Sequence, residues 1–189
     1  MSIRVPWIPT PRIVIEYLMY VLNIGPHDTI LDLGCGDGRL LINAAKRGAR
    51  GICIEIDRVM CNITSIASKL AGVEDRIKII CTDFFTTNLK ELEPRPNIVY
   101  AYLYTSILSE LAPKLEQELD PGTIIITLDF SIRNWSPFYV KHIVDENDHD
   151  RALWFYLIGI SNPSARYVGI SREYKLIAEK LKNKTLYLD

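Results

Sequence analysis

Short apolar runs alternate with stretches of helical periodicity along most of the chain. Five runs bounded by polar or glycine-containing turns predict strands at residues 29–33, 51–55, 76–81, 97–102 and 123–128. Between these runs, and before the first, apolar residues recur at the spacing of one helix face. The predicted helices run from Pro11 to near Asn23, with Thr10 as its cap, then over 38–47, 58–71, a short stretch near 86–92, and 104–119, where Pro113 predicts a kink or restart.

The alternation changes after the fifth strand. Two strand-like runs, 138–144 and 152–160, follow each other without a helix, and the polar segment 145–150 joins them. This pattern predicts an antiparallel hairpin at one edge of the sheet. The sequence therefore predicts an α/β fold, a Rossmann-like seven-stranded mixed sheet with helices on both faces and a C-terminal antiparallel hairpin.

The chain of 189 residues is long enough for one domain, which we place at residues 1–160. Residues 161–189 form an extension in which apolar positions at helical spacing predict a helix over 171–182. We expect this helix to pack on the domain or on a second subunit. The apolar residues at this helical spacing are Ile170, Tyr174, Ile177, Ala178 and Leu181.

The composition is that of an ordinary globular protein, with 48% apolar residues, 24% charged residues and a net charge of −1. No strong positive charge points to nucleic acid, and no apolar stretch is long enough to span a membrane. Because the N-terminus also lacks the apolar core of a signal peptide, we expect a cytoplasmic protein. The abundance of isoleucine and the single glutamine, Gln117, hint at a thermophilic organism.

The four cysteines form no metal-binding or redox motif by spacing. Cys53 and Cys81 fall two residues before a strand-end acid on adjacent predicted strands, so they are candidates for proximity. Buried free thiols are the default in a cytosolic protein, although intracellular disulfides are less unusual in thermophiles. No set of side chains predicts a bound metal.

A glycine-rich turn follows the first strand and leads into a helix, which is where α/β sheets bind nucleotide-like ligands. Gly34, Gly36 and Gly38 lack the spacing of a dinucleotide site, whose last small residue is replaced here by Arg39. Asp32 stands before the first glycine, where a carboxylate repels a pyrophosphate but suits a cationic amino-acid group. The turn therefore predicts a site for S-adenosylmethionine, which carries an ammonium and a sulfonium.

Acidic residues also close the next two strands. Glu55 lies about 20 residues beyond the loop, at the separation expected of a ribose-binding acid. Asp83 follows the third strand, where its carboxylate can accept from an adenine amino group, and Phe84 can pack against the ring. One such acid is usually a solvated loop charge, but three closing successive strands favour a cofactor site.

On these residues the chain resembles the seven-strand S-adenosylmethionine-dependent methyltransferases. It resembles more narrowly the small archaeal protein-lysine methyltransferases and their mitochondrial relatives, which methylate ATP synthase and the adenine nucleotide carrier. The resemblance covers about residues 5–160 and rests on the glycine loop, on the Pro-Thr-Pro entry at 9–11, and on the loop 130–137. It implies that the following residues contact the cofactor: Thr10, Asp32, Gly34, Gly36, Asp37, Gly38, Glu55, Ile56, Asp83, Phe84 and Tyr100.

The acceptor side is expected where the fourth strand ends. Tyr100, Tyr102 and Tyr104 alternate there, and an aromatic channel would lower the pKa of an entering lysine by desolvation and accept a methylated ammonium. Tyr102 and Trp135 are the catalytic candidates. The Asn-Pro-Pro-Tyr motif of many amino-methylating relatives is missing, which argues against methylation of adenine or glutamine amides. Asp129 is a candidate for binding the incoming ammonium, and Arg133 is expected to pair with Asp129 or Glu55.

These patterns predict an enzyme that methylates exposed lysines of proteins, with broad specificity because no substrate-recognition domain is present. Two alternatives stay open at this point. An RNA or small-molecule methyltransferase could use the same fold, although the net charge makes RNA a weaker candidate. A non-catalytic protein could retain the cofactor site as a sensor, because an intact site does not prove turnover.

Overall fold

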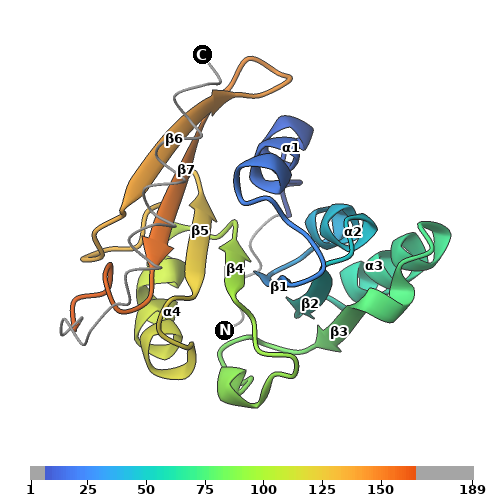
Figure 1. The fold of residues 1–189 in the computed structure, drawn as a ribbon, viewed down its shortest axis with the longest axis horizontal. Helices are drawn as coiled ribbons and strands as arrows, with labels where there is room; N and C mark the ends of the chain where they lie inside the picture. Colours follow the sequence, from blue (N-terminus) through green and yellow to red (C-terminus); the bar gives the residue numbers. More distant parts are fainter. Residues whose placement is uncertain (1–6, 165–189) are drawn as a thin grey trace.

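The fold, obtained as a computed structural model, is described for residues 7–164, so the predicted helix at 171–182 lies outside the described residues. A single seven-stranded sheet with the order β3-β2-β1-β4-β5-β7-β6 runs through the molecule (Figure 1). Five strands are parallel, and β7 pairs antiparallel with both β5 and β6. The elements are α1 Arg12–Val21, β1 Thr29–Leu33, α2 Arg39–Lys46, β2 Arg50–Glu55, α3 Arg58–Leu70, η1 Glu74–Arg76, β3 Ile77–Cys81, η2 Leu89–Glu91, β4 Ile98–Ala101, α4 Thr105–Glu118, β5 Ile124–Leu128, β6 Tyr139–Val144 and β7 Asp150–Leu157.

This architecture confirms the predicted fold class, including the antiparallel hairpin formed by β6 and β7. Predicted strand bounds agree with the observed ones to within one residue for the five parallel strands. The hairpin is shifted slightly, because β7 begins within the polar segment that we assigned to the turn. Apolar runs bounded by turns make strands easy to locate, whereas their pairing extends into polar residues that the pattern cannot detect.

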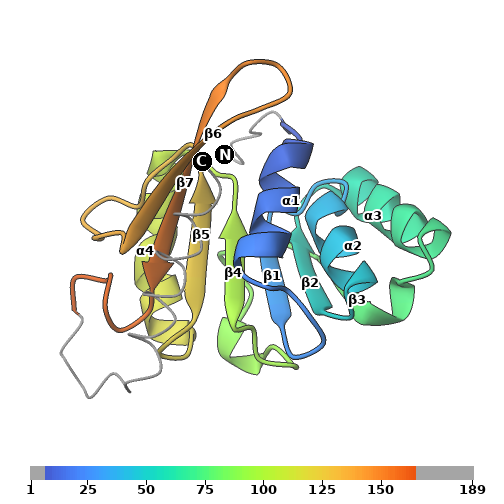
Figure 2. The same cartoon turned by 45° about the horizontal axis from the view of Figure 1, so that its top comes forward.

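The sheet is buried on both faces between two apolar cores. One core contains side chains of α1 and α2, with flanking residues of α3, and the other contains those of α4 and η2. Figures 1 and 2 accordingly show α1, α2 and α3 on one side of the sheet and α4 on the other. The parallel strands are almost wholly apolar because both of their faces are covered.

The predicted cap of α1 is wrong, and α4 does not restart at Pro113. Thr10 does not cap α1; Pro11 occupies that position, and the Thr10 hydroxyl hydrogen-bonds to the hydroxyl of Tyr100 instead, at 3.0 Å. Pro113 neither ends nor restarts α4, which continues from Thr105 to Glu118 with the proline inside it. Packing of Leu108, Leu111 and Leu115 against the sheet stabilises that helix on both sides of the proline.

All four cysteines are paired, so the prediction of free thiols is wrong. Cys35 of the glycine loop is bonded to Cys53 of β2, and Cys61 of α3 is bonded to Cys81 at the end of β3. Cys53 and Cys81 do not pair with each other, because each has a partner on the neighbouring loop or helix. The two disulfides therefore connect elements that lie around the carboxyl ends of β1, β2 and β3.

The carboxyl ends of the parallel strands meet at one edge of the sheet, hereafter called the carboxyl edge. The β6–β7 hairpin projects beyond this edge, because Leu128 at the end of β5 pairs with Leu153 and the turn lies further on. Its tip returns to the start of α1, where Glu146 accepts a hydrogen bond from the amide of Arg12 at 3.0 Å. Loops, the start of α1 and the hairpin thus surround the carboxyl edge.

Candidate active site

The glycine loop after β1 has a backbone that only small residues can follow. Gly34, Gly36 and Gly38 all have positive φ angles, of 79°, 56° and 73°. A Cβ built on Gly36 would lie 2.0 Å from Nε1 of Trp7, and one on Gly38 would lie 2.5 Å from a methyl group of Thr64. Both glycines are therefore required by close approach as well as by backbone conformation.

Asp32 is a buried carboxylate without a cation beside it. Its side chain lies in β1 at 4% residue exposure, in register with Cys53 and Tyr100. No hydrogen bond or ion pair within residues 7–164 involves this carboxylate. Burial, together with the nearby charges of Glu55 and Asp37, raises the pKa of Asp32 to about 8. A cationic ligand at this position would compensate the buried charge.

Glu55 lies at the end of β2 and points toward the glycine loop. One carboxylate oxygen accepts from the amide of Gly36 at 3.0 Å, and the other accepts from the amide of Asp57 at 2.9 Å. These bonds hold the carboxylate in place, and each oxygen keeps a second lone pair for another donor. Ile56 follows it with 56% of its surface exposed, so an apolar side chain stands open beside the predicted ribose-binding acid.

Arg39 connects the loop to the N-terminal segment. Its guanidinium is bound by the carboxylate of Asp37 at 2.7 Å, donates to the Thr10 carbonyl at 3.3 Å, and lies 5.8 Å from the Trp7 ring centroid. Asp37 is therefore engaged by Arg39, and Thr10 lies over the carboxyl edge by way of Tyr100. Tyr100 itself is 2% exposed and lies in register beside Asp32 on the neighbouring strand.

Asp83 lies just beyond β3 and closes its own turn. One carboxylate oxygen accepts from the amide of Phe85 at 2.9 Å, while its carbonyl accepts from Thr86. Phe84 is half-buried, and its ring centroid is 4.9 Å from that of Phe85. The structure thus places this carboxylate and this ring at the third strand end, as the spacing predicts.

An aromatic cluster made by Tyr102, Tyr104 and Phe130 stands where β4 and β5 end. The ring centroid of Phe130 is 6.4 Å from that of Tyr102 and 5.0 Å from that of Tyr104, the latter in an edge-on arrangement. Tyr104 remains 37% exposed, so the cluster is accessible from solvent. Phe130 was not predicted, because a lone aromatic residue two positions beyond a strand carries no signal in the sequence.

Arg151 joins this cluster to the hairpin through a set of charged hydrogen bonds. Asp129 accepts at the same oxygen from the Tyr102 hydroxyl and from Arg151, both at 2.8 Å, and Arg151 also donates to Asp145 at 2.7 Å. The second Asp129 oxygen accepts from the amide of Ala152. Burial and the bond to Asp129 raise the pKa of Tyr102 to about 12, so its hydroxyl stays protonated at neutral pH.

These contacts revise two predictions. The Asp129 charge is already paired with Arg151, and its Oδ2 also accepts from Tyr102 while its Oδ1 accepts from the amide of Ala152, which disfavours a role in binding an ammonium. Arg133 is exposed and forms no ion pair with the described residues, so its expected pairing with Asp129 or Glu55 is wrong. Arg151 fills that role from β7, a strand far from Asp129 in the sequence.

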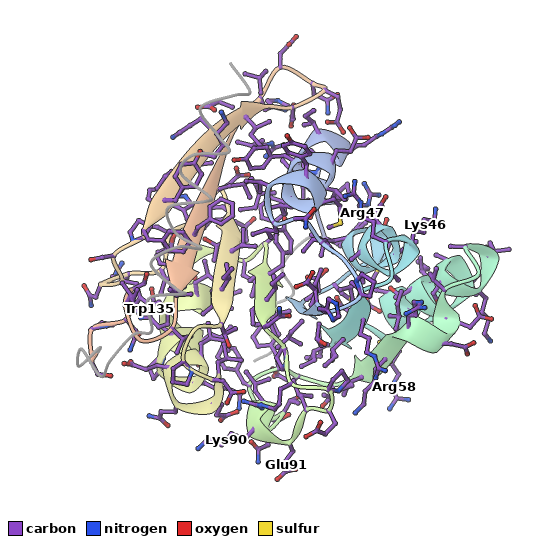
Figure 3. All side chains as sticks on the ribbon, in the orientation of Figure 1. Lys46, Arg47, Arg58, Lys90, Glu91 and Trp135 are labelled. Carbon is purple, nitrogen blue, oxygen red and sulfur yellow. A yellow bond between two sulfur atoms is a disulfide. The ribbon has the colours of Figure 1, made fainter. Side chains whose placement is uncertain are left out.

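Trp135 lies in the core rather than at the acceptor side. It is 7% exposed and packs edge-on against Tyr156 of β7, at 6.0 Å between ring centroids. Figure 3 shows Trp135 next to α4 and β7, in agreement with its membership of the α4 core. This position does not support a catalytic role, and burial of a large ring anchors the loop after β5 instead.

Within residues 7–164, no group of three or more His, Cys, Asp or Glu side chains is arranged to hold a metal ion. In the same part of the chain, no helix has both the length and the apolar character needed to cross a membrane.

The donor set fits a nucleoside that carries positive charge. The unpaired Asp32 carboxylate suits an ammonium group, the glycine loop permits close approach of a ligand to the backbone, and Glu55 suits a pair of hydroxyls. A pyrophosphate would place negative charge against the carboxylates of Asp32 and Glu55, neither of which is paired with a cation of the described residues. Fold and site together define a methyltransferase of the seven-strand class.

Comparison with known proteins agrees with this class. The family described as the ANTKMT methyltransferase domain matches residues 32–139. A protein-lysine N-methyltransferase of Saccharolobus islandicus (strain REY15A) is 35% identical over 160 residues, which are 82% of this chain and 95% of that protein. The chain therefore belongs to the ANTKMT methyltransferase domain family, and its cofactor is S-adenosylmethionine.

Two further similarities extend the comparison. The adenine nucleotide translocase lysine N-methyltransferase of Mus musculus is 25% identical over 171 residues, which are 90% of this chain and 70% of that protein. Among solved structures, an RNA methyltransferase from Salinibacter ruber in complex with S-adenosyl-L-homocysteine is 31% identical, with a TM-score of 0.71. The match covers 80% of this chain and 94% of that one.

Proposed function

We propose that the protein transfers a methyl group from S-adenosylmethionine to the ε-amino group of lysine side chains in proteins. The observation that carries this proposal is the aromatic cluster of Tyr102, Tyr104 and Phe130 at the end of β4 and β5, on the same edge as the unpaired Asp32. The similarity to the archaeal protein-lysine methyltransferase supports lysine as the acceptor.

The cofactor would be held by residues from three successive strand ends. Asp32 and the glycine loop face the amino-acid portion, Glu55 the ribose, and Ile56, Asp83 and Phe84 the adenine. When bound, the cofactor supplies an electrophilic methyl group on a sulfonium. Deprotonated Asp32 stabilises the positive charge of the bound amino-acid portion, and Glu55, fixed by the amides of Gly36 and Asp57, is already oriented for hydroxyl donors.

The acceptor side must supply a neutral amine. A lysine in water has a pKa of about 10.4, so only a small fraction is neutral at pH 7. Aromatic surroundings lower this pKa by desolvation, and ring faces of the cluster can contact the cationic product. The Asp129–Arg151 pair adds no net charge there and fixes the Tyr102 hydroxyl. Tyr102 is therefore the residue that we assign to contact the acceptor.

A broad range of protein substrates and a cytoplasmic site of action are part of the proposal. The described part of the chain contains the sheet, its covering helices and short connections, with no additional domain over the carboxyl edge. The exposed face of Tyr104 supports acceptance of lysines on different protein surfaces.

RNA methylation is the second candidate, because the similar Salinibacter ruber protein is named as an RNA methyltransferase. The net charge of −1 gives little electrostatic attraction to a phosphate backbone. We therefore place protein lysine first.

One labelling experiment separates these candidates. The protein is incubated with S-adenosylmethionine carrying a labelled methyl group and with equal amounts of mixed cell protein, total RNA and a small-molecule extract. We expect label in acid-stable methyl-lysine of the protein fraction and none with the Asp32→Asn variant. Label that appears only in RNA would support the second candidate, and label only in small molecules would reject both.

A further inference from the structure

The outward face of α3 carries a stripe of aliphatic side chains, hereafter the α3 stripe. Val59, Ile63, Ile66 and Leu70 are 64%, 40%, 59% and 86% exposed. The opposite face of the helix, which packs on the rest of the protein, carries the smaller residues Cys61, Thr64 and Ser68. A helix on a soluble domain normally buries its apolar side, so this arrangement is reversed.

The spacing of the stripe is that of a coiled-coil seam. The four residues stand at i, i+4, i+7 and i+11, which are alternating a and d positions of a heptad, and extend over about 16 Å. The spacing is also symmetric about its centre. Two copies of α3 packed antiparallel would therefore place Val59 opposite Leu70 of the second copy, and Ile63 opposite Ile66.

We propose that the α3 stripe is an isologous interface through which two copies of this chain associate. The charges at the ends of the helix fit the same register. Arg58 begins α3, and exposed Glu74 and Asp75 follow its end, so antiparallel pairing brings Arg58 of one copy toward the acids of the other. Figures 1 and 2 place α3 at one end of the molecule, and Figure 3 shows Arg58 on its surface.

Two other occupants fit less well. A lipid surface would require a surplus of cations, whereas the cations Arg58, Lys69 and Arg76 are matched by the acids Asp57, Glu74 and Asp75. The local charge therefore favours a protein partner over an anionic membrane.

The chain's own C-terminal extension is the second alternative. Ser164, the last described residue, hydrogen-bonds to Glu116 of α4, which covers the face of the sheet opposite to α3. The described part of the chain therefore ends on the other face of the sheet from the stripe, and the Ile177→Glu variant tests this occupant.

The four side chains of the α3 stripe form only the centre of an interface, whereas a standard protein–protein interface buries about 800 Å² per partner. We therefore expect a modest affinity, with a dissociation constant on the order of 10 µM. Sedimentation equilibrium of the full chain measures it. Ile66→Glu places a charge in the interface and should weaken association at least about tenfold, while Tyr20→Glu, on the exposed face of α1, should not change it.

Cross-linking tests the orientation. Because the four native cysteines are paired, an introduced cysteine is the only free thiol. A mixture of the Val59→Cys and Leu70→Cys proteins should form a mixed disulfide dimer on oxidation, and Val59→Cys alone should not. A dimer formed by Val59→Cys alone would overturn the antiparallel arrangement.

Three results would overturn the interface itself. These are a wild-type chain that stays monomeric well above 10 µM, association that is lost in Ile177→Glu but kept in Ile66→Glu, or flotation with phosphatidylcholine–phosphatidylglycerol vesicles that depends on Ile66. The measurements use no methyl acceptor. They are therefore independent of the proposed function, and S-adenosylhomocysteine binding by Ile66→Glu serves as the control for folding.

Discussion

Replacing Asp32 with asparagine should stabilise the protein and abolish cofactor binding. The folded protein holds the Asp32 carboxyl at a pKa of about 8, whereas an unfolded chain releases that proton near pH 4. At pH 7 the ionisation of Asp32 therefore lowers the free energy of unfolding by about 4 kcal/mol. Asparagine has a similar shape and does not ionise, although burial of its amide offsets part of the gain.

The sign of the pH dependence follows from the raised pKa. Between about pH 4 and pH 8 the folded state binds more protons than the unfolded state, so wild-type stability falls as the pH rises. The Asp32→Asn variant lacks this dependence. Its advantage should grow by about 3 kcal/mol between pH 5 and pH 7, and at pH 7 a net gain of roughly 2 kcal/mol raises Tm by about 5 °C.

Urea unfolding at pH 5 and pH 7, with and without S-adenosylhomocysteine, measures both effects. The ligand should stabilise the wild type against urea. It should leave the stability of the variant unchanged, because asparagine offers no carboxylate to the ligand's ammonium group. In the wild type, affinity for this ligand should rise up to tenfold per pH unit and level off near pH 8. A variant that is less stable at both pH values, or that binds the ligand like the wild type, would refute the role assigned to Asp32.

Three further predictions follow from the geometry. Gly36→Ala should lower S-adenosylhomocysteine affinity at least about tenfold, because the added Cβ meets Trp7. The control, Gly72→Ala, changes a glycine with a similar φ of 66° and nothing within 4 Å, so it should cost only about 1 kcal/mol of stability. Equal binding by the two variants in calorimetry would contradict this. Arg151→Gln should release Tyr102 and so lower kcat roughly tenfold, with S-adenosylhomocysteine affinity unchanged. The control, Arg95→Gln, breaks an ion pair with Asp120 at the opposite edge of the sheet and should leave kcat unchanged. A loss of kcat in both variants would show a general effect of stability. The two disulfides close loops of 18 and 20 residues, so reducing each should lower the free energy of unfolding by about 3 kcal/mol. Alkylation of cysteines in the denatured, unreduced chain would contradict the pairing.

The sheet was predictable because its strands are apolar on both faces and end at turns. Local patterns such as Thr29–Leu33 followed by the glycine loop carry enough information to place a strand, a turn and a helix. The acids Asp32, Glu55 and Asp83 were found for the same reason, since parallel topology brings consecutive strand ends to one edge.

Long-range pairing was not predictable in this way. Arg151 contacts Asp129 and Tyr102 only because β7 lies beside β5, and its position in the sequence gives no sign of either partner. Trp135 is an aromatic residue in a proline-containing loop, which in the sequence is typical of a functional position, yet its ring is buried. The periodicity of α3 predicts a helix but does not reveal which of its faces the helix buries.

Peptide mapping by mass spectrometry shows which amino acid accepts the methyl group. Mixed cell protein is treated with the wild type and with the Asp32→Asn variant in the presence of methyl-deuterated S-adenosylmethionine. We expect deuterated methyl groups on lysine ε-amines with the wild type alone. Deuterium confined to RNA or to residues other than lysine would contradict it.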